Sequence, residues 1–181
     1  MKEGWCIWLT GLPGSGKSTV AKAFLTKLKN NKIHAQILSS DELRKAITPD
    51  PKYTDEERNI VYRTICYIAE LLTKNNINVI IDATGNRKSY RDKAREEIKN
   101  FKEIYLTCSL GVCIERESKR MNTSHAPKGI YEKAFKGKST VPGIGSPYEE
   151  PLNPELKLNT ERLNPNICAE RIFKLIIEKD T

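Results

Sequence analysis

The sequence lacks the features that mark membrane and secreted proteins. No apolar run reaches the roughly 18–20 residues that span a bilayer, and the opening residues 1–5 contain no apolar segment of the kind that secretory signals carry. No C-x-x-C pair is present, so the sequence indicates neither a zinc site nor a dithiol redox motif. We therefore expect a cytoplasmic protein that does not interact with a membrane.

The cysteines indicate no disulfide framework. They are odd in number, scattered along the chain and mostly set in apolar surroundings, where cysteine acts as a small hydrophobic residue. We expect a structural role for Cys6, Cys66, Cys108, Cys113 and Cys168.

The sequence has fewer acidic than basic residues. The 181 residues include 31 Lys and Arg against 23 Asp and Glu, which gives a formal net charge of +8. Such an excess suits nucleic acid, an acidic membrane surface or a small anionic substrate, and charge alone does not distinguish them. Aromatic and basic residues do not interleave as they do in nucleic-acid-binding proteins, so we expect no nucleic-acid partner.

Short apolar runs alternate with amphipathic stretches. Strands are predicted at 5–9, 33–38, 79–81, 104–110 and 156–158, and helices at 18–29, 53–75, 88–100 and 164–178. This alternation predicts one α/β domain over residues 1–181, a three-layer sandwich with a mostly parallel sheet and helices on both faces. Residues 119–154 lack the periodicity and are rich in Lys, Gly, Pro and Ser, which predicts a mobile lid.

Two helices carry specific signals at their ends and faces. Asn164 followed by Pro165 predicts the start of the last helix. Thr54 and Glu57 form a capping-box pattern at the start of the long helix. Helical spacing predicts that the buried face of this helix consists of Ile60, Val61, Ile65, Ile68, Leu71 and Leu72.

The strongest functional signal matches the pattern G-x-x-x-x-G-K-S/T in full. It lies between a predicted strand and a predicted helix, which is the context that this phosphate-binding loop requires. Its glycines let backbone N–H groups point at phosphates, Lys17 would reach the β- and γ-phosphates, and Ser18 would ligate Mg²⁺. We expect ATP to be bound by Gly11, Leu12, Pro13, Gly14, Ser15, Gly16, Lys17, Ser18 and Thr19.

Two acidic residues follow predicted strands. Asp41 would lie beside the phosphate loop if the second strand neighboured the first, and it could there accept the proton of an attacking hydroxyl. It could also cap a short helix at 42–46. Asp82 ends an apolar strand, as does the acidic residue that holds Mg²⁺ in many phosphate-loop proteins. The alternative for Asp82 is a turn residue at the end of the strand.

Basic residues are frequent after the fourth strand. Arginine or lysine from a closing lid can neutralise charge on a phosphoryl group in transfer. We expect Arg116 to contact ATP, and Arg120 is a further candidate. A solvated basic face is the alternative, and it is the favoured interpretation for each of the lid lysines Lys119, Lys128, Lys133 and Lys138.

These residues resemble the adenylyl-sulfate kinase family of P-loop kinases, which use ATP to phosphorylate the 3′-hydroxyl of adenylyl sulfate. The resemblance extends over nearly the whole chain. It rests on residues 8–19, the Asp41-x-x-Arg44 pair, and the segments 53–59, 87–95, 128–134 and 142–151. The last two segments carry a lid pattern that P-loop kinases in general lack.

The resemblance implies specific roles. Lys17 and Asp41 would be catalytic, with Asp41 as the base, and Tyr53 would stack on the base of the acceptor nucleotide. The acceptor-binding residues that it implies are Asp41, Arg44, Tyr53, Arg58, Thr84 and Ile144. A homodimer is also implied. The Mg²⁺ ligands Ser18 and Asp82 are predicted by the phosphate-loop motif and by the acidic end of the third strand.

The chain departs from the family pattern on the acceptor side. Residues 39–42 and 82–85 differ from the usual segments, Val61 replaces an asparagine, and residues 116–128 form a longer stretch. Val141 stands where the family has a second aromatic ring against the purine, and stacking on such a ring is worth about 1–3 kcal/mol per base. The acceptor is therefore adenylyl sulfate or another modified nucleotide, such as a cytidine diphosphoramidate.

Two other interpretations stay open. Residues 82–85 also suit a generic small-molecule or nucleic-acid-end kinase, although the lid pattern argues against it. The second interpretation is a nucleotide-binding regulator without turnover, and the presence of Lys17, Ser18 and Asp41 argues against it.

Overall fold

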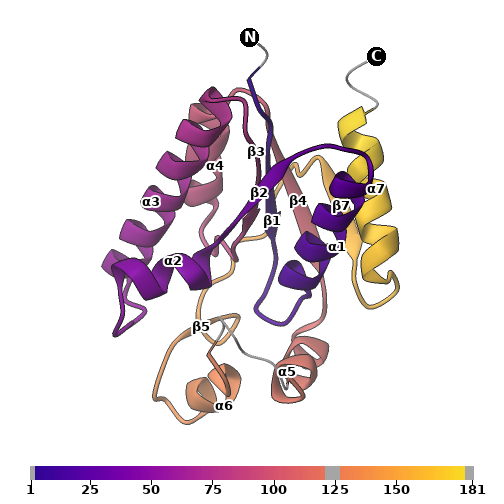
Figure 1. The fold of residues 1–181 in the computed structure, drawn as a ribbon. Coiled ribbons are helices and arrows are strands. Elements are labelled where there is room, and N and C mark those ends of the chain that lie inside the picture. The colour runs from indigo at the N-terminus through magenta and orange to yellow at the C-terminus, as the bar shows by residue number, and fades with distance from the viewer. Residues whose placement is uncertain (1–2, 121–126, 178–181) are drawn as a thin grey trace.

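A five-stranded parallel sheet forms the centre of the computed structural model, which describes residues 3–120 and 127–177 (Figure 1). The strand order across the sheet is β2-β3-β1-β4-β7, and each neighbouring pair is parallel. The strands are β1 (Cys6–Thr10), β2 (Ala35–Ser39), β3 (Asn78–Asp82), β4 (Phe101–Thr107) and β7 (Leu156–Asn159). The α/β fold with a parallel sheet that the sequence predicts is confirmed.

Helices cover both faces of the sheet, as expected. On one side lie α1 (Lys17–Asn30) and α7 (Pro165–Ile177), and on the other lie α3 (Asp55–Lys74) and α4 (Lys88–Glu97) (Figure 1). Side chains alternate between the faces of a strand, and in β1 Ile7 and Leu9 pack in the core beneath α1 and α7. Trp8, between them, packs in the other core. The result is a three-layer sandwich with two apolar cores.

The predicted start of α7 is confirmed, but the predicted buried face of α3 is partly wrong. Asn164 Oδ1 accepts a hydrogen bond from the Ile167 N–H at 3.0 Å, so α7 begins as expected. In α3, Val61 and Ile65 are buried, whereas Ile60 and Leu71 are 55% and 44% exposed. The reason is that smaller and polar-tipped residues occupy the inner face in their place, namely Tyr62, Cys66, Ala69 and Thr73.

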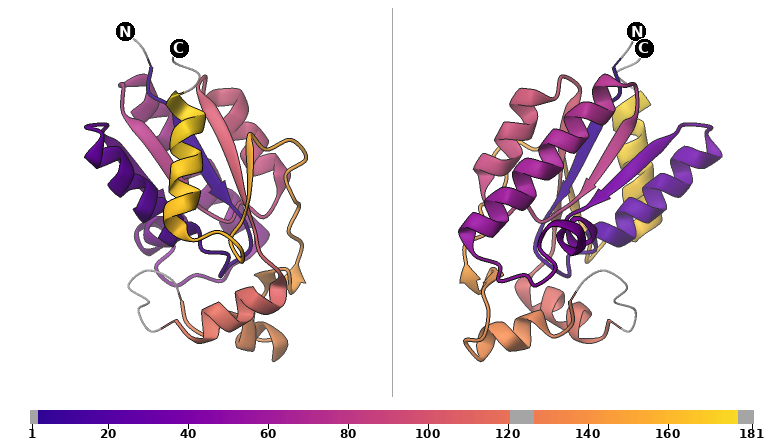
Figure 2. Two further views of the ribbon diagram at one scale, coloured as in Figure 1. Left: turned by 90° about the vertical axis from the view of Figure 1, so that its right-hand side faces the viewer. Right: turned by 60° about the vertical axis from the view of Figure 1, so that its left-hand side comes forward.

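The region after β4 is more ordered than the sequence indicates. It contains α5 (Leu110–Ser118), which the sequence did not predict, α6 (Ile130–Phe135), and the short strands β5 (Val141–Pro142) and β6 (Gly145–Ser146) (Figure 2). A small apolar cluster joins them through Cys113, Tyr131, Ala134 and Val141. Residues 121–126 of the expected lid lie outside the described residues. We call residues 127–154 the lid segment, and its mobility stays a prediction.

Across residues 3–120 and 127–177, no helix combines the length and the apolar character that a membrane span needs.

Arg91 in α4 ties several elements together. Its side chain is 1% exposed and forms an ion pair with Glu103 of β4. It also donates to the carbonyl of Gly85, after β3, and to that of Glu149, at 2.6 Å, in the lid segment. The loop that follows β3 is therefore held between α4 and the lid segment by one buried guanidinium.

We predict that Arg91→Leu lowers the free energy of unfolding by about 3–5 kcal/mol, because Glu103 would keep a buried charge without its partner. Urea denaturation followed by circular dichroism measures the change. The control is Lys93→Ala, an exposed residue of the same helix, for which we expect a change within about 0.5 kcal/mol. A loss below about 1 kcal/mol for Arg91→Leu would contradict the structural role.

Candidate active site

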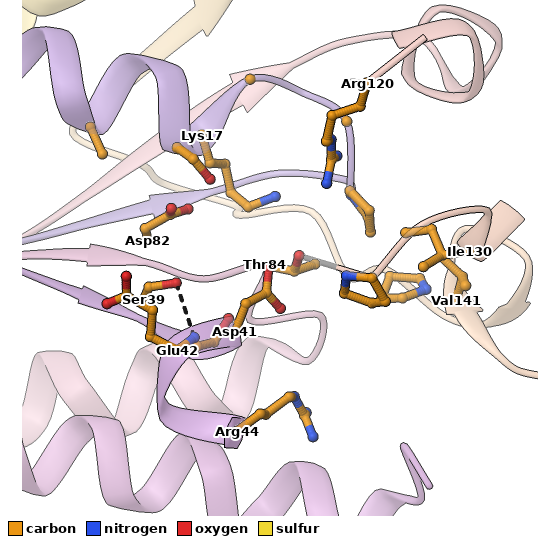
Figure 3. Close-up of a pocket in the computed structure, with 18 of the residues that line it drawn as sticks. Lys17, Ser39, Asp41, Glu42, Arg44, Asp82, Thr84, Arg120, Ile130 and Val141 are labelled. Carbon is orange, nitrogen blue, oxygen red and sulfur yellow. Dashed lines mark hydrogen bonds between the residues drawn. The ribbon is translucent and has the colours of Figure 1, made fainter. Parts of the chain in front are cut away.

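The carboxyl ends of three strands meet at one edge of the sheet. The register places Asp82 beside both Ser39 of β2 and Leu9 of β1. A cavity of about 850 Å³ opens at this edge, between the phosphate loop, the start of α2 (Ser40–Ile47) and the lid segment (Figure 3). The condition that the second strand neighbours the first is not met, because β3 lies between them, yet Asp41 lines the same cavity.

The phosphate loop has the backbone geometry that the motif predicts. Gly16 precedes α1 with a φ of 94°, a left-handed conformation that glycine adopts without steric cost. Lys17 is buried, and its Nζ donates to the carbonyls of Gly11 and Leu12 at 3.0 Å each. The loop residues that line the cavity are Pro13, Gly14, Gly16, Lys17, Ser18 and Thr19, whereas Gly11, Leu12 and Ser15 do not line it.

Two carboxylates, those of Asp82 and Asp41, line the cavity together with Lys17 (Figure 3). Burial lowers the pKa of Lys17, and the charges of Asp82 and Asp41 act in the opposite direction. A cation in this position attracts phosphate groups, because the partners of its hydrogen bonds are neutral carbonyls.

Asp41 faces the cavity because another residue caps the helix. Ser39 is the N-cap of α2, and its Oγ accepts from the Glu42 N–H at 3.4 Å. The alternative that Asp41 caps this helix is therefore wrong. Burial raises the pKa of Asp41, the charge of Asp82 raises it further, and nearby cations oppose the shift. A carboxylate with a raised pKa is a better proton acceptor, as a general base requires.

Asp82 and Ser18 form an oxygen donor set next to the phosphate loop. Asp82 is 8% exposed at the end of β3, and both residues line the cavity. Among the described residues, no group of three or more His, Cys, Asp or Glu could hold a metal ion. A carboxylate and a hydroxyl suit Mg²⁺, which commonly binds one or two protein oxygens together with phosphates and water. The residues therefore fit the Mg²⁺ site that the sequence predicts.

Glu57 organises the acceptor side of the cavity, a role that sequence reasoning missed. Its carboxylate accepts from the Tyr53 N–H at 2.6 Å and from the guanidinium of Arg44 at 3.1 Å. Tyr53 has a φ of 57°, which is uncommon for a residue other than glycine, and the bond from its N–H supports this strained turn. The Arg44 guanidinium lies 4.8 Å from the centre of the Tyr53 ring.

The capping-box pattern was the only feature of the sequence that singled out Glu57. One of the two hydrogen bonds that it predicts is present. Thr54 Oγ1 accepts from the Glu57 N–H at 3.2 Å, as the pattern predicts. The Glu57 carboxylate does not accept the second hydrogen bond of the pattern, which would come from the Thr54 N–H. It accepts from the N–H groups of Lys52 and Tyr53 at 2.7 and 2.6 Å, and it thereby fixes the residues before the helix.

Arg58 joins α3 to the lid segment. This buried guanidinium lines the cavity and donates to Ser146 Oγ at 3.2 Å and to Thr140 Oγ1 at 3.1 Å. Thr84 also lines the cavity, and its carbonyl accepts from Thr10 Oγ1 at 2.6 Å. Ile144 does not line the cavity and packs instead against the apolar cluster of the lid segment. The acceptor contacts of all three stay predictions.

Arg116 lines the cavity, but its guanidinium is held by Thr160. It donates to the Thr160 carbonyl at 2.8 Å and to Thr160 Oγ1 at 3.2 Å, and Thr160 Oγ1 donates to the Ser15 carbonyl at 2.9 Å. Arg116 therefore supports the phosphate loop from one side. Among the four lid lysines, Lys133 alone lines the cavity.

The model of the adenylylsulphate kinase family matches residues 3–159. A probable adenylyl-sulfate kinase of Pyrococcus abyssi is 36% identical over 173 residues, which cover 95% of this chain and 94% of that protein. The adenylyl-sulfate kinase of Rippkaea orientalis is 36% identical over 161 residues, with coverage of 88% and 84%. The APS kinase of Mycobacterium tuberculosis, solved in complex with AMPPNP and APS, superposes with a TM-score of 0.85 at 32% identity and covers 98% of this chain and 99% of its own. The chain therefore belongs to the adenylylsulphate kinase family of P-loop kinases and is a phosphotransferase with an alcohol group as its acceptor.

Proposed function

We propose that the protein transfers the γ-phosphoryl group of ATP to the 3′-hydroxyl of adenylyl sulfate. The observation that carries the proposal is the shared cavity, in which Lys17 of the phosphate loop, Asp41 and the acceptor-side Tyr53 lie together. The names of the relatives in Pyrococcus abyssi and Rippkaea orientalis support this acceptor, as does the neighbour solved with AMPPNP and APS. Membership of a kinase family favours turnover over a purely regulatory role.

In the proposed reaction, the acceptor hydroxyl attacks the γ-phosphorus in line, and the bond to the oxygen that bridges the β- and γ-phosphates breaks to release ADP. Asp41 orients the hydroxyl and takes its proton. Lys17 holds the β- and γ-phosphates. Ser18 and Asp82 would hold Mg²⁺, which neutralises phosphate charge when it is bound. The lid segment covers the cavity and excludes water that would hydrolyse ATP.

One observation favours a second acceptor class, a cytidine nucleotide such as a cytidine diphosphoramidate. Val141 is buried and lines the cavity where the family pattern places an aromatic ring. Tyr53 therefore lacks the aromatic partner that would enclose a purine, and Arg44 lies over one face of its ring. A smaller base that stacks on one side suits this arrangement. The comparisons give this acceptor no support.

The homodimer that the family resemblance implies is also part of the proposal. The outer side of α3 supports it, because Ile60, Tyr67 and Leu71 lie at spacings of seven and four residues, one face of a helix, and are 55%, 59% and 44% exposed. An apolar stripe of this kind is typical of an interface between protein chains.

A cytoplasmic location completes the proposal. All five cysteines are free, and four of them are buried. Unpaired cysteines are the normal state in a reducing compartment.

We predict that Asp41→Asn lowers kcat with adenylyl sulfate by about 10²–10⁴-fold, because an amide cannot accept the proton of the hydroxyl. The affinity for ATP should change by less than about twofold, since Asp41 follows β2 and is not part of the phosphate loop. A coupled assay of ADP release and calorimetric titration of ATP measure the two quantities. Asp50→Asn, an exposed residue that does not line the cavity, is the control. Unchanged turnover would remove Asp41 from its role as the base.

A panel of acceptors tests the substrate. With ATP and Mg²⁺, we expect adenylyl sulfate to give the highest kcat/KM, ahead of cytidine diphosphoramidate and of gluconate as a small-molecule control. Val141→Phe should lower the KM for adenylyl sulfate by about fivefold or more, since a stacked base gains about 1–3 kcal/mol. Val141→Leu, which adds volume without a ring, should not. Faster turnover of the cytidine compound, with adenylyl sulfate inert, would replace the first acceptor by the second.

Light scattering tests the oligomeric state. We expect a mass of about twice the 20.6 kDa of the chain. Tyr67→Glu, which places a charge in the apolar stripe, should yield the monomer, because an unpaired charge is costly to bury. Lys22→Glu, at an exposed position of α1, changes charge in the same direction and should leave the dimer intact. A monomeric wild-type protein would contradict the proposal.

A further inference from the structure

Arg120 reaches into the active-site cavity from the end of α5. It lines the same cavity as Lys17 and Asp41, and its guanidinium extends toward the side of Lys17 (Figure 3). The residue lies in the stretch after Arg116 that is longer than the family pattern, so none of the matched motifs assigns it a role.

The guanidinium of Arg120 differs from the neighbouring cations in its partners. Arg116 is held by Thr160, and Lys119 forms an ion pair with Glu115 outside the cavity. Within residues 3–120 and 127–177, no residue is a hydrogen-bond or ion-pair partner of the Arg120 side chain. None of the residues described in these two ranges competes with an anion in the cavity for its donors.

The backbone on both sides of Arg120 is anchored near the phosphate loop. The Arg120 N–H donates to the Glu117 carbonyl at 3.2 Å. The buried Glu117 carboxylate accepts from the Gly129 N–H at 2.8 Å, which fixes the start of α6 against the end of α5. In α6, the Tyr131 hydroxyl donates to the Pro13 carbonyl at 2.7 Å. The turn that carries Arg120 is thus held in position relative to the loop that would bind ATP.

The charge of Arg120 acts on both halves of the cavity. The pKa of Lys17 is lowered mainly by burial, and Arg120 adds to that effect. The pKa of Asp41 is raised mainly by burial, and Arg120 opposes it. Arg120, Lys17 and Asp41 line the same cavity, so the guanidinium borders the space in which the γ-phosphoryl group would pass during transfer.

We propose that Arg120 is a catalytic residue whose guanidinium binds the γ-phosphoryl group of ATP while it moves to the acceptor hydroxyl. Negative charge spreads over the three outer oxygens of this group in the transition state. The guanidinium fork donates two parallel hydrogen bonds to such oxygens, and its charge is fixed because arginine stays protonated. The inference rests on the proposed transfer from ATP, but it does not depend on which nucleotide is the acceptor.

Arg120→Ala and Arg120→Lys test this role, with Lys119→Ala as the adjacent control. We expect Arg120→Ala to lower kcat by about 10²–10³-fold, as does the loss of one donor to developing negative charge. Arg120→Lys should recover part of the rate because it keeps the charge, and guanidinium ions should partly restore Arg120→Ala. Lys119→Ala should retain kcat within about twofold, because its ion pair is exposed.

A binding measurement without acceptor separates this inference from the proposed function. In Arg120→Ala, the affinity for AMPPNP should fall about tenfold or more while the affinity for ADP stays unchanged, since only AMPPNP carries a γ-phosphoryl group. Equal losses for both nucleotides, or an unchanged kcat, would overturn the role of Arg120. A wild-type enzyme that turns over no acceptor in the panel would count against the proposed function, and the two nucleotide affinities would still decide on Arg120.

Discussion

Parallel pairing of β2, β3 and β1 is the constraint on which the site depends. The register sets Ser39 beside Asp82 and Asp82 beside Leu9, so the chain leaves all three strands at the same level. The phosphate loop, the metal-side carboxylate and the start of α2 therefore converge although they are far apart in sequence. A shift of one residue would exchange the two faces of a strand and would break both cores, so packing fixes the register and the register fixes the site.

Among the ionisable groups that line the cavity, Asp82 affects the pKa of both Lys17 and Asp41. Burial disfavours the charged forms of Lys17 and Asp41. The attraction between these two residues favours the charged form of both, and the attraction of Asp82 favours the charged form of Lys17. Asp82 also raises the pKa of Asp41, so the two carboxylates are unequal partners of one cation. Proteins accept such unfavourable burial at functional sites, where the remainder of the structure compensates. Here the compensation comes from the apolar cores on both faces of the sheet.

Contiguous patterns were predictable, and partners distant in sequence were not. The phosphate loop and the start of α7 follow from neighbouring residues, because glycine, asparagine and proline impose local geometry. The order β2-β3-β1 depends on pairing between distant segments, which no local pattern encodes. For the same reason the sequence could not show that Arg116 binds Thr160, 44 residues away. Serine and aspartate are both common N-cap residues, so the local sequence did not show that Ser39, and not Asp41, caps α2.

The net charge of +8 carries less information than the partners of individual cations. Many lysines pair with an acidic residue one helical turn away on exposed faces, as Lys74 does with Glu70, and contribute little beyond solvation. Buried Arg91 is matched by Glu103 and serves the fold. Lys17 donates to carbonyls, which carry no net charge, so its positive charge is available to a ligand. The basic composition indicates anion binding here because buried Lys17, at the end of a parallel sheet, has no hydrogen-bonded carboxylate among the described residues.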